Sequence, residues 1–336
     1  MSQSLDIAVV GATGTVGETI VQILEEREFP LGTLNLLASA ESAGHSVPFR
    51  GKNVRVREVD EFDFGKVQLV FFAAGPAITR SYAARATAAG CAVIDLSAGL
   101  AVTQAPNIIP QINAVLLANR VKPYQLACPS PTAAALALVI APLRRVLDVQ
   151  RVSVTACLAV SSQGREGVTE LARQTTELLN IRPVESKVFD RQMAFNVLAQ
   201  VGTPDADGHV PLEKRLVAEL RELLALPLLK VAVTCIQVPV FFGDSFSVSL
   251  QTAAPVDLAV INALLDEADG IELVEAGDYP TAVGDAVGQD AVYVGRLRQG
   301  IDDACELNLW ITSDNVRKGA ALNAVQVAEL LIKDVV

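Results

Sequence analysis

The chain has 336 residues, of which 51% are hydrophobic, and it carries a formal net charge of −11 at pH 7. This length and hydrophobic content suffice for two ordinary domains with buried cores, which excludes an intrinsically disordered protein. The acidic balance argues against nucleic acid or an anionic membrane as the main partner, because both require a basic surface.

The first residues, MSQSLDIAVV, lack a charged segment followed by an apolar core, so we expect no signal peptide. The longest apolar region, near residues 132–143, is too short to span a bilayer. Five cysteines without CxxC spacing fit a reduced cytoplasmic protein that has no zinc site. Because the chain also has only two histidines, we expect no metal site and a cytoplasmic location.

The first part of the chain alternates between predicted strands and predicted helices. Four short apolar runs are typical of buried strands, and helical segments follow the first and the third. This alternation predicts an α/β fold, a doubly wound parallel sheet with right-handed crossovers. The predicted strands are residues 5–10, 34–39, 67–74 and 91–97, and the predicted helices begin after residue 17 and cover about 79–89.

After about residue 145 the pattern changes to strands separated by long helices, which predicts an α+β domain with a mostly antiparallel sheet. A last helix, from about residue 315 to 332, is expected to pack back on the first domain. We therefore predict two domains, residues 1–132 with 313–336 and residues 133–312. The later strands are expected at 151–161, 230–241 and 245–253, and the helices at 167–179 and 212–225.

The sequence GATGTVG occupies residues 11–17, between the first predicted strand and a helix. Glycines there permit a tight turn and the close approach of a pyrophosphate, to which the helix N-terminus offers N–H donors. The spacing is GxxGxxG rather than GxGxxG, and the alternative is a glycine-rich turn that packs a helix on a strand. Its place directly after the first strand favours a dinucleotide-binding loop.

The stretch ACPSPTAAAL, residues 127–136, places Cys128 just before a predicted helix. A helix N-terminus favours a thiolate, so a cysteine there is a candidate nucleophile. The alternative is a small packing residue, which is the commoner role of a lone cysteine in an apolar stretch.

The chain carries GATGTVG (11–17), VIDLS (93–97) and QVPVFFGDS (237–245), and together with other segments from residue 5 to the last helix these resemble the aspartate-semialdehyde dehydrogenase family. The resemblance implies a Rossmann-type first domain and an α+β dimerisation domain. Members of this family reduce an aspartyl phosphate with NADPH through a thioester on a cysteine, and they are dimers built through the second domain. The matching segments are GATGTVG (11–17), LASAESAG (37–44), FFAAG (71–75), VIDLS (93–97), AVSSQGREG (159–167), AFNVLAQ (194–200), QVPVFFGDS (237–245), YPTAVGDAVGQDAVYVGR (279–296) and LWITSDNVRKGAALNA (309–324).

The nucleophile position that this resemblance implies does not hold a cysteine. An ungapped fit through Pro129 places it at Pro131 and the preceding asparagine at Ser130, whereas a one-residue gap places the nucleophile at Ser130. Cys128 lies three residues before Pro131 and would point elsewhere. Without a strong base, serine is a much poorer nucleophile than a thiolate near neutral pH, and proline offers none.

Four further positions of the implied site have also changed. The family's catalytic histidine corresponds to Asp244, whose ionised carboxylate would repel a thiolate. The arginine that holds the substrate carboxylate corresponds to Gln237, the phosphate-binding arginine falls near Ala101, and a glutamine corresponds to Leu158. We therefore assign no catalytic residue and predict that the fold is retained without the family reaction.

The positions implied for the cofactor are largely retained, although the alternative is that they only hold turns and helix caps. The arginine that pairs with the 2′-phosphate of NADP corresponds to Glu41, which repels a phosphate and suits the ribose of NAD. If a dinucleotide binds, we expect NAD to bind no worse than NADP, unless Glu41 is merely a solvated loop residue. The predicted cofactor-binding residues are Gly11, Thr13, Gly14, Thr15, Val16, Gly17, Ser39, Glu41, Gly75 and Asn315.

Three functions remain open at this point: a catalytically silent homodimer with a scaffold, regulatory or binding role, an oxidoreductase acting on another aldehyde, and a partner that alters the activity of an active relative. In each case we expect a homodimer that contacts neither nucleic acid nor a membrane. A new substrate site would draw on the polar residues Ser130, Ser162, Gln163, Arg165, Gln237 and Asp244.

Overall fold

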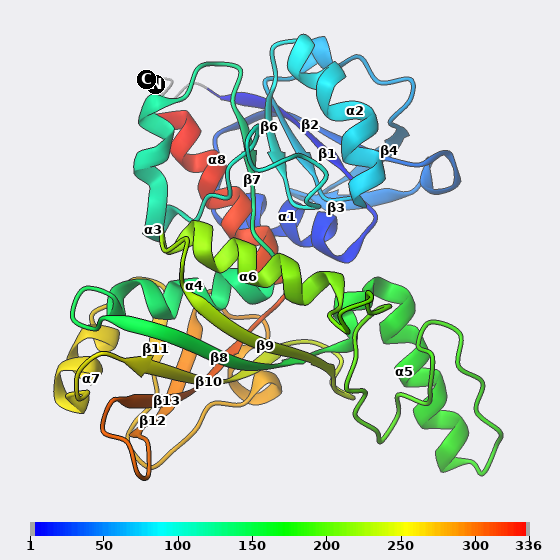
Figure 1. The fold of residues 1–336 in the computed structure, drawn as a ribbon. Helices are drawn as coiled ribbons and strands as arrows, with labels where there is room; N and C mark the ends of the chain where they lie inside the picture. The colour runs from blue at the N-terminus through cyan, green and yellow to red at the C-terminus, as the bar shows by residue number, and fades with distance from the viewer. Residues whose placement is uncertain (1–3, 334–336) are drawn as a thin grey trace. The chain divides into compact units, whose positions relative to one another are not determined.

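The computed structural model describes residues 4–333, which fold as two compact units. The first unit holds the chain as far as Ser130 and resumes at Ala320, and the second unit is Pro131–Gly319. Figure 1 shows each unit as a sheet with helices packed on it. None of the helices in the described range is long and apolar enough to cross a membrane.

The first unit contains a seven-stranded sheet in the order β3-β4-β2-β1-β5-β6-β7. All neighbouring pairs are parallel except β3 with β4, and β1 lies between β2 and β5. The predicted doubly wound parallel sheet is therefore confirmed. Its strands are β1 Leu5–Val10, β2 Leu31–Ala38, β3 Ser46–Phe49, β4 Lys52–Glu58, β5 Leu69–Phe72, β6 Ala92–Asp95 and β7 Gln125–Ala127.

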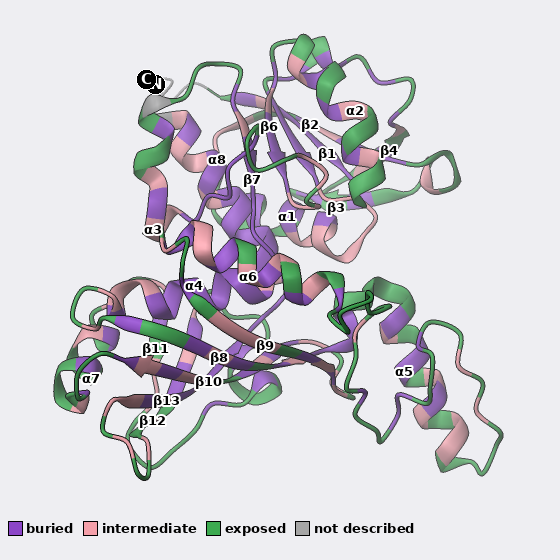
Figure 2. Ribbon diagram, in the orientation of Figure 1, coloured by how far each residue is buried: buried purple, intermediate pink, exposed green. Residues whose placement is uncertain are grey.

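Helices cover both faces of this sheet and create two separate cores. Ile7 and Val9 of β1 share one core with α1 (Thr15–Glu26) and α8 (Asn323–Lys333). Ala8 and Val10 share the other with α2 (Pro76–Ala88). Figure 2 shows the resulting band of buried residues along the strands. The last helix, α8, therefore packs on the first unit, as predicted. This unit also contains a short helix, α3 (Pro110–Asn113).

The second unit contains a six-stranded mixed sheet in the order β11-β12-β13-β10-β8-β9. The centre is antiparallel, as predicted, but β8 with β9 and β11 with β12 are parallel. The strands are β8 Val149–Leu158, β9 Lys230–Gln237, β10 Asp244–Thr252, β11 Ile271–Leu273, β12 Val292–Gln299 and β13 Glu306–Ser313. The helices are α4 Pro131–Leu143, α5 Gly164–Leu179, α6 Pro211–Leu223 and α7 Leu258–Asp266.

Candidate functional site

The glycine-rich loop after β1 is a tight turn that only glycine can make at two positions. Gly11 has a φ of +87°, and a Cβ there would lie 2.8 Å from the backbone of Ala73. A Cβ on Gly17 would lie 2.1 Å from the carbonyl oxygen of Gly11. The loop therefore brings the start of α1 close against β1.

The N-terminus of α1 is built to receive an anion. Gly14 is its N-cap and offers no capping side chain, which leaves the first backbone N–H groups for another acceptor. The loop follows β1, whose neighbours β2 and β5 lie on opposite sides, and ligands of open α/β sheets bind at such a switch point. The cradle fits the pyrophosphate of a dinucleotide.

Other predicted cofactor residues of the first unit lie at the same edge of the sheet. Ser39 and Glu41 follow the end of β2 and are exposed, and Gly75 is the N-cap of α2 after β5. Because parallel neighbouring strands end at one edge, these residues lie along the side on which the glycine-rich loop stands. Thr13, Thr15 and Val16 of the loop are half-buried.

Asn315 belongs to the second unit, where its side chain is already engaged. Its Oδ1 accepts a hydrogen bond from the backbone N–H of Gly243 (3.1 Å), and its Nδ2 donates to Ser161 Oγ (3.0 Å). The neighbouring Asp314 caps the backbone N–H groups of Val316 and Arg317. These contacts fit the alternative in which Asn315 only holds a turn. A role for Asn315 in binding the cofactor stays a prediction.

Cys128 lies in the core of the first unit and is 1% exposed. Burial raises the pKa of its thiol to about 12, although a hydrogen bond with Asn323 opposes this effect. Such a thiol is protonated at neutral pH and is a poor nucleophile.

The position implied for the phosphate-binding arginine is near Ala101. This residue is exposed in the loop after β6, and its carbonyl oxygen accepts the N–H of Ala105.

The two alternative nucleophile positions straddle the boundary between the units. Ser130 is the last residue of the first unit and is buried, whereas Pro131 is the first residue of α4 in the second unit. Proline at the start of a helix needs no partner for its missing N–H group. Pro131 therefore has a complete structural role at the position where the resemblance implies a cysteine.

Three of the predicted site positions meet at one end of the second unit's sheet. Leu158 ends β8 opposite Gln237, which ends β9, and Asp244 begins β10. Asp244 Oδ1 accepts the backbone N–H of Ala159, the residue after Leu158 (2.9 Å). All three side chains are buried, so the sheet places a hydrocarbon, an amide and a carboxyl group side by side.

The amide of Gln237 is held by the end of β8. Its Nε2 donates to the carbonyl oxygen of Leu158 (2.7 Å) and lies 3.4 Å from Ser162 Oγ. Its Oε1 has one contact, at 3.5 Å, from the same hydroxyl group. The donors of this amide are therefore used internally, while its oxygen retains capacity to accept a hydrogen bond.

Asp244 is 3% exposed, and its environment changes its protonation. Burial raises the pKa of its carboxyl to about 7; the N–H of Ala159 lowers the pKa, and the charge of Asp314 raises it further. With a pKa of about 7 the carboxyl is partly protonated near neutral pH, which weakens the repulsion expected from an ionised Asp244. Desolvation of the charged form is the physical reason, and burial cannot be read directly from a sequence.

Sequence reasoning missed a buried hydroxyl group beside this carboxyl. Ser313 of β13 lies directly opposite Asp244 on β10, so the two side chains share a face of the sheet. Within residues 4–333, the Oγ of Ser313 and the Oγ1 of Thr312 are buried and have no hydrogen-bond partner. A protonated Asp244 adds a hydrogen-bond donor beside the Ser313 hydroxyl group.

Two family models match the chain, one in each unit. The model described as semialdehyde dehydrogenase, NAD binding domain, matches residues 6–120. The model described as semialdehyde dehydrogenase, dimerisation domain, matches residues 140–318. The chain therefore contains an NAD(P)-binding domain and a dimerisation domain.

Similarity to known proteins extends over almost the whole chain. The chain is 58% identical over 333 residues to the USG-1 protein homolog of Azotobacter vinelandii, with 99% of each covered. It is 57% identical to the structure of a probable aspartate-semialdehyde dehydrogenase from Pseudomonas aeruginosa, with a TM-score of 0.97 over 99% of this chain and 100% of that one. It is 40% identical to aspartate semialdehyde dehydrogenase II from Vibrio cholerae, solved in complex with ASA, with a TM-score of 0.95 over 99% of each chain. The chain belongs to the aspartate-semialdehyde dehydrogenase family.

Proposed function

We propose that this protein is a dimeric, dinucleotide-binding member of its family that does not carry out the phosphate-dependent oxidation of aspartate semialdehyde. The observation that supports it most is the corner formed by Leu158, Gln237 and Asp244, where a buried carboxyl and an internally bonded amide occupy the positions implied for a histidine and an arginine. Neither group can act as an imidazolium or hold a carboxylate by charge. Turnover assays with aspartate semialdehyde, phosphate and either cofactor test the proposal.

The nucleophile positions also support a silent site. Pro131 has no nucleophilic atom, and Cys128 is a buried thiol whose pKa is raised to about 12. A thioester mechanism needs a thiolate, an acid–base group and two anion anchors in one geometry. Because such groups act as a unit, the loss of one removes most of the catalytic rate. The loss of all of them removes the family reaction, while the fold is retained.

We expect NAD to bind no worse than NADP. Glu41 is exposed in a short turn after β2, where a carboxylate repels a 2′-phosphate and accepts hydrogen bonds from an unmodified ribose. Loss of one charged hydrogen bond removes roughly 1.5–3 kcal/mol, and about 1.4 kcal/mol is tenfold in affinity. Titration calorimetry with both cofactors measures this, and Glu41→Arg should move the preference toward NADP by about tenfold or more.

The matched control is Glu61→Arg, which makes the same charge change at an exposed position of the first unit outside the predicted cofactor residues. It should leave the ratio of the two affinities unchanged. A clear preference of the unmodified protein for NADP would mean that Glu41 does not face the ribose.

We expect a homodimer formed through the second unit. Alternate residues of its central strands, among them Thr155 of β8 and Ser247 of β10, are exposed on one face of the sheet. An obligate interface should bury upwards of about 2,000 Å². Sedimentation should show a dimer at micromolar concentration, and Ser247→Arg should shift it toward monomer, whereas Ser81→Arg on α2 should not. A monomeric unmodified protein would remove this prediction.

A further inference from the structure

The first unit contains a pocket of about 330 Å³ at the edge of the sheet where its parallel strands begin. Residues from the starts of β1, β5 and β6 and from the segment before β7 line it, together with Leu331 of α8. The glycine-rich loop follows the end of β1 and therefore lies at the opposite edge. Because ligands of open α/β sheets bind outside the carboxyl ends of the strands, this pocket is separate from the candidate dinucleotide site.

One wall of the pocket is the end of the core between the sheet and α8. Leu5 of β1, Leu69 of β5, Leu331 of α8 and the ring of Tyr124 all belong to this core. Leu69 is 1% exposed and Leu331 is 3% exposed, so the wall is formed by core side chains rather than by mobile surface groups. A hydrocarbon group that contacts them leaves water, which favours its binding. The volume of the pocket lies at the lower end of the range of small-molecule sites.

Tyr124 brings a hydroxyl group to this apolar wall. The residue is only 9% exposed, and within residues 4–333 its hydroxyl group forms no hydrogen bond. In the same range, the hydroxyl groups of Thr312 and Ser313 are the side-chain groups that are both unpartnered and fully covered. The Tyr124 hydroxyl therefore lies at the small open surface of a residue that lines the pocket. Because a buried tyrosine usually has a hydrogen-bond partner, this hydroxyl is available to a ligand.

A positive charge lies beside this tyrosine. The Nζ of Lys122 lies 6.0 Å from the centroid of the Tyr124 ring, and Lys122 lines the same pocket. Lys122 is exposed, and in the part of the chain that the structure describes no carboxylate pairs with its ammonium group. An ammonium and a phenol are both hydrogen-bond donors, and a carboxylate accepts from both. This end of the pocket therefore suits a carboxylate.

The acidic residue among those that line the pocket, Asp6, is turned away from Lys122. Its Oδ1 accepts the backbone N–H of Thr33 of β2 (2.6 Å). Strand β2 lies on one side of β1, whereas β5, β6 and β7 follow in order on the other side. Three strand spacings separate β1 from β7, about 14 Å, which exceeds the screening length of about 8 Å at physiological salt. Asp6 therefore does not oppose an anion at Lys122.

We propose that this pocket binds a small aliphatic monocarboxylate. The carboxylate contacts the Lys122 ammonium and the Tyr124 hydroxyl, and the aliphatic chain lies on Leu69 and Leu331. An α-ammonium group on the ligand would be repelled by Lys122, so the class does not include α-amino acids. The inference goes beyond the proposed function, because the pocket uses no residue of the corner around Asp244 or of the glycine-rich loop.

The test compares three probes with one six-carbon skeleton: hexanoate, hexanamide, which lacks the charge, and norleucine, which adds an α-ammonium group. Titrations of the full chain followed by ligand-observed NMR should give a dissociation constant for hexanoate at least about tenfold below those of the other two. Acetate keeps the charge but lacks the chain, and it should also bind at least about tenfold more weakly than hexanoate.

Variants of the two donors locate the site. Lys122→Gln and Tyr124→Phe should each weaken hexanoate binding about fivefold or more, and both should leave the affinity for hexanamide within about twofold. The matched control is Lys52→Gln, which removes the same charge from an exposed position at the start of β4 and should leave both affinities unchanged. Circular dichroism checks that each variant is folded.

No detectable binding of hexanoate by the unmodified protein, or binding of hexanamide or norleucine that is as tight, would overturn the inference. So would equal losses of hexanoate affinity in Lys122→Gln and Lys52→Gln, which would indicate attraction by overall charge rather than by this pocket. The titrations involve no cofactor and no turnover, so their outcome is independent of whether the protein oxidises aspartate semialdehyde.

Discussion

The double variant Pro131→Cys with Asp244→His should remain without significant aspartate-semialdehyde dehydrogenase activity. It places a thiol at the start of α4 and an imidazole at the start of β10, but Gln237 and the loop around Ala101 still offer no positive charge. Each missing charged contact costs roughly 1.5–3 kcal/mol. The two together should keep the rate about 10²–10⁴-fold below that of an active family member assayed in parallel.

Addition of Gln237→Arg to this double variant supplies one of the two anchors. It should raise turnover by about 10–100-fold relative to the double variant, in the value of kcat/KM measured with saturating phosphate and cofactor. The matched control is Gln150→Arg in the same background, which should have no effect. Circular dichroism and sedimentation check that each variant folds and assembles. A double variant that reaches the rate of an active family member would contradict the account.

Asp244→Asn should stabilise the protein above neutral pH. The pKa of this carboxyl is raised from 3.8 to about 7 in the folded state, mainly by burial. Between these values the folded chain binds more protons than the unfolded chain, so the free energy of unfolding falls as pH rises. Above about pH 7 the carboxyl is ionised in both states, and the loss reaches its full size, on the order of 4 kcal/mol.

An asparagine keeps the acceptor for the N–H of Ala159 and cannot ionise. The variant should therefore exceed the unmodified protein in urea-unfolding free energy at about pH 8–9, and the difference should close as pH falls toward 4. The same change at the exposed Asp302 should give no pH-dependent difference. An Asp244→Asn variant that is equally stable at every pH would show that the carboxyl is not strained by its burial.

The parallel sheet could be predicted because its central strands are buried on both faces. Ile7 and Val9 face one core and Ala8 and Val10 the other, so β1 is a continuous apolar run. Strand β4, two places from β1 in the sheet, could not be predicted from the same signal, because its sequence KNVRVRE is largely charged and exposed. Its place in the sheet depends on pairing with β2, a tertiary contact that outweighs local preference.

The last helix also differs from what the sequence predicts. The sequence predicts one helix over about 315–332, whereas a π-helical turn at Arg317–Leu322 precedes α8, and the unit boundary falls between Gly319 and Ala320. Two hydrogen bonds to Asp314 hold this turn: its carbonyl oxygen accepts the N–H of Gly319, and its Oδ1 accepts the N–H of Val316. Hydrophobic periodicity identifies the helix but carries no signal for such a local change of winding.

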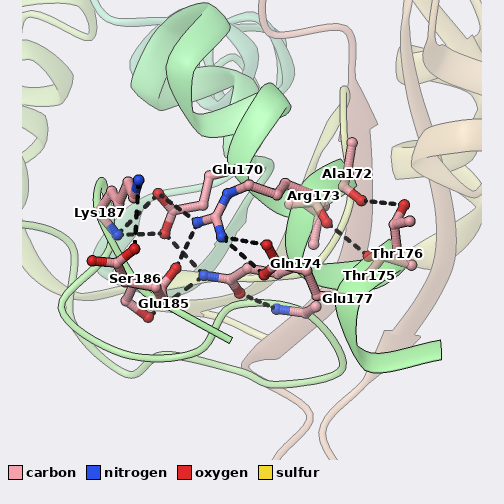
Figure 3. Close-up of polar contacts among 12 residues, drawn as sticks. Glu170, Ala172, Arg173, Gln174, Thr175, Thr176, Glu177, Glu185, Ser186 and Lys187 are labelled. Carbon is pink, nitrogen blue, oxygen red and sulfur yellow. Dashed lines mark hydrogen bonds and ion pairs between the residues drawn. The ribbon is translucent and has the colours of Figure 1, made fainter. Parts of the chain in front are cut away.

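The glycine-rich loop could be predicted from the spacing of its glycines, because Gly11 and Gly17 are required by the local backbone geometry. The positions Leu158, Gln237 and Asp244 were reached only through the family resemblance, since they are far apart in the sequence. Glu170 and Gln174, four residues apart on an amphipathic helix, are typical of a solvated face, yet they are buried and bind the backbone of another segment (Figure 3).

The central claim is tested most directly by one assay of the unmodified protein. Aspartate semialdehyde, phosphate and either NAD or NADP are supplied together, and the absorbance of the reduced cofactor is followed. We predict no formation above the background without protein, and no change in the Cys128→Ala variant, because that thiol is buried and its pKa is raised to about 12. Steady phosphate-dependent turnover that is lost in Cys128→Ala would contradict the account and identify Cys128 as a displaced nucleophile.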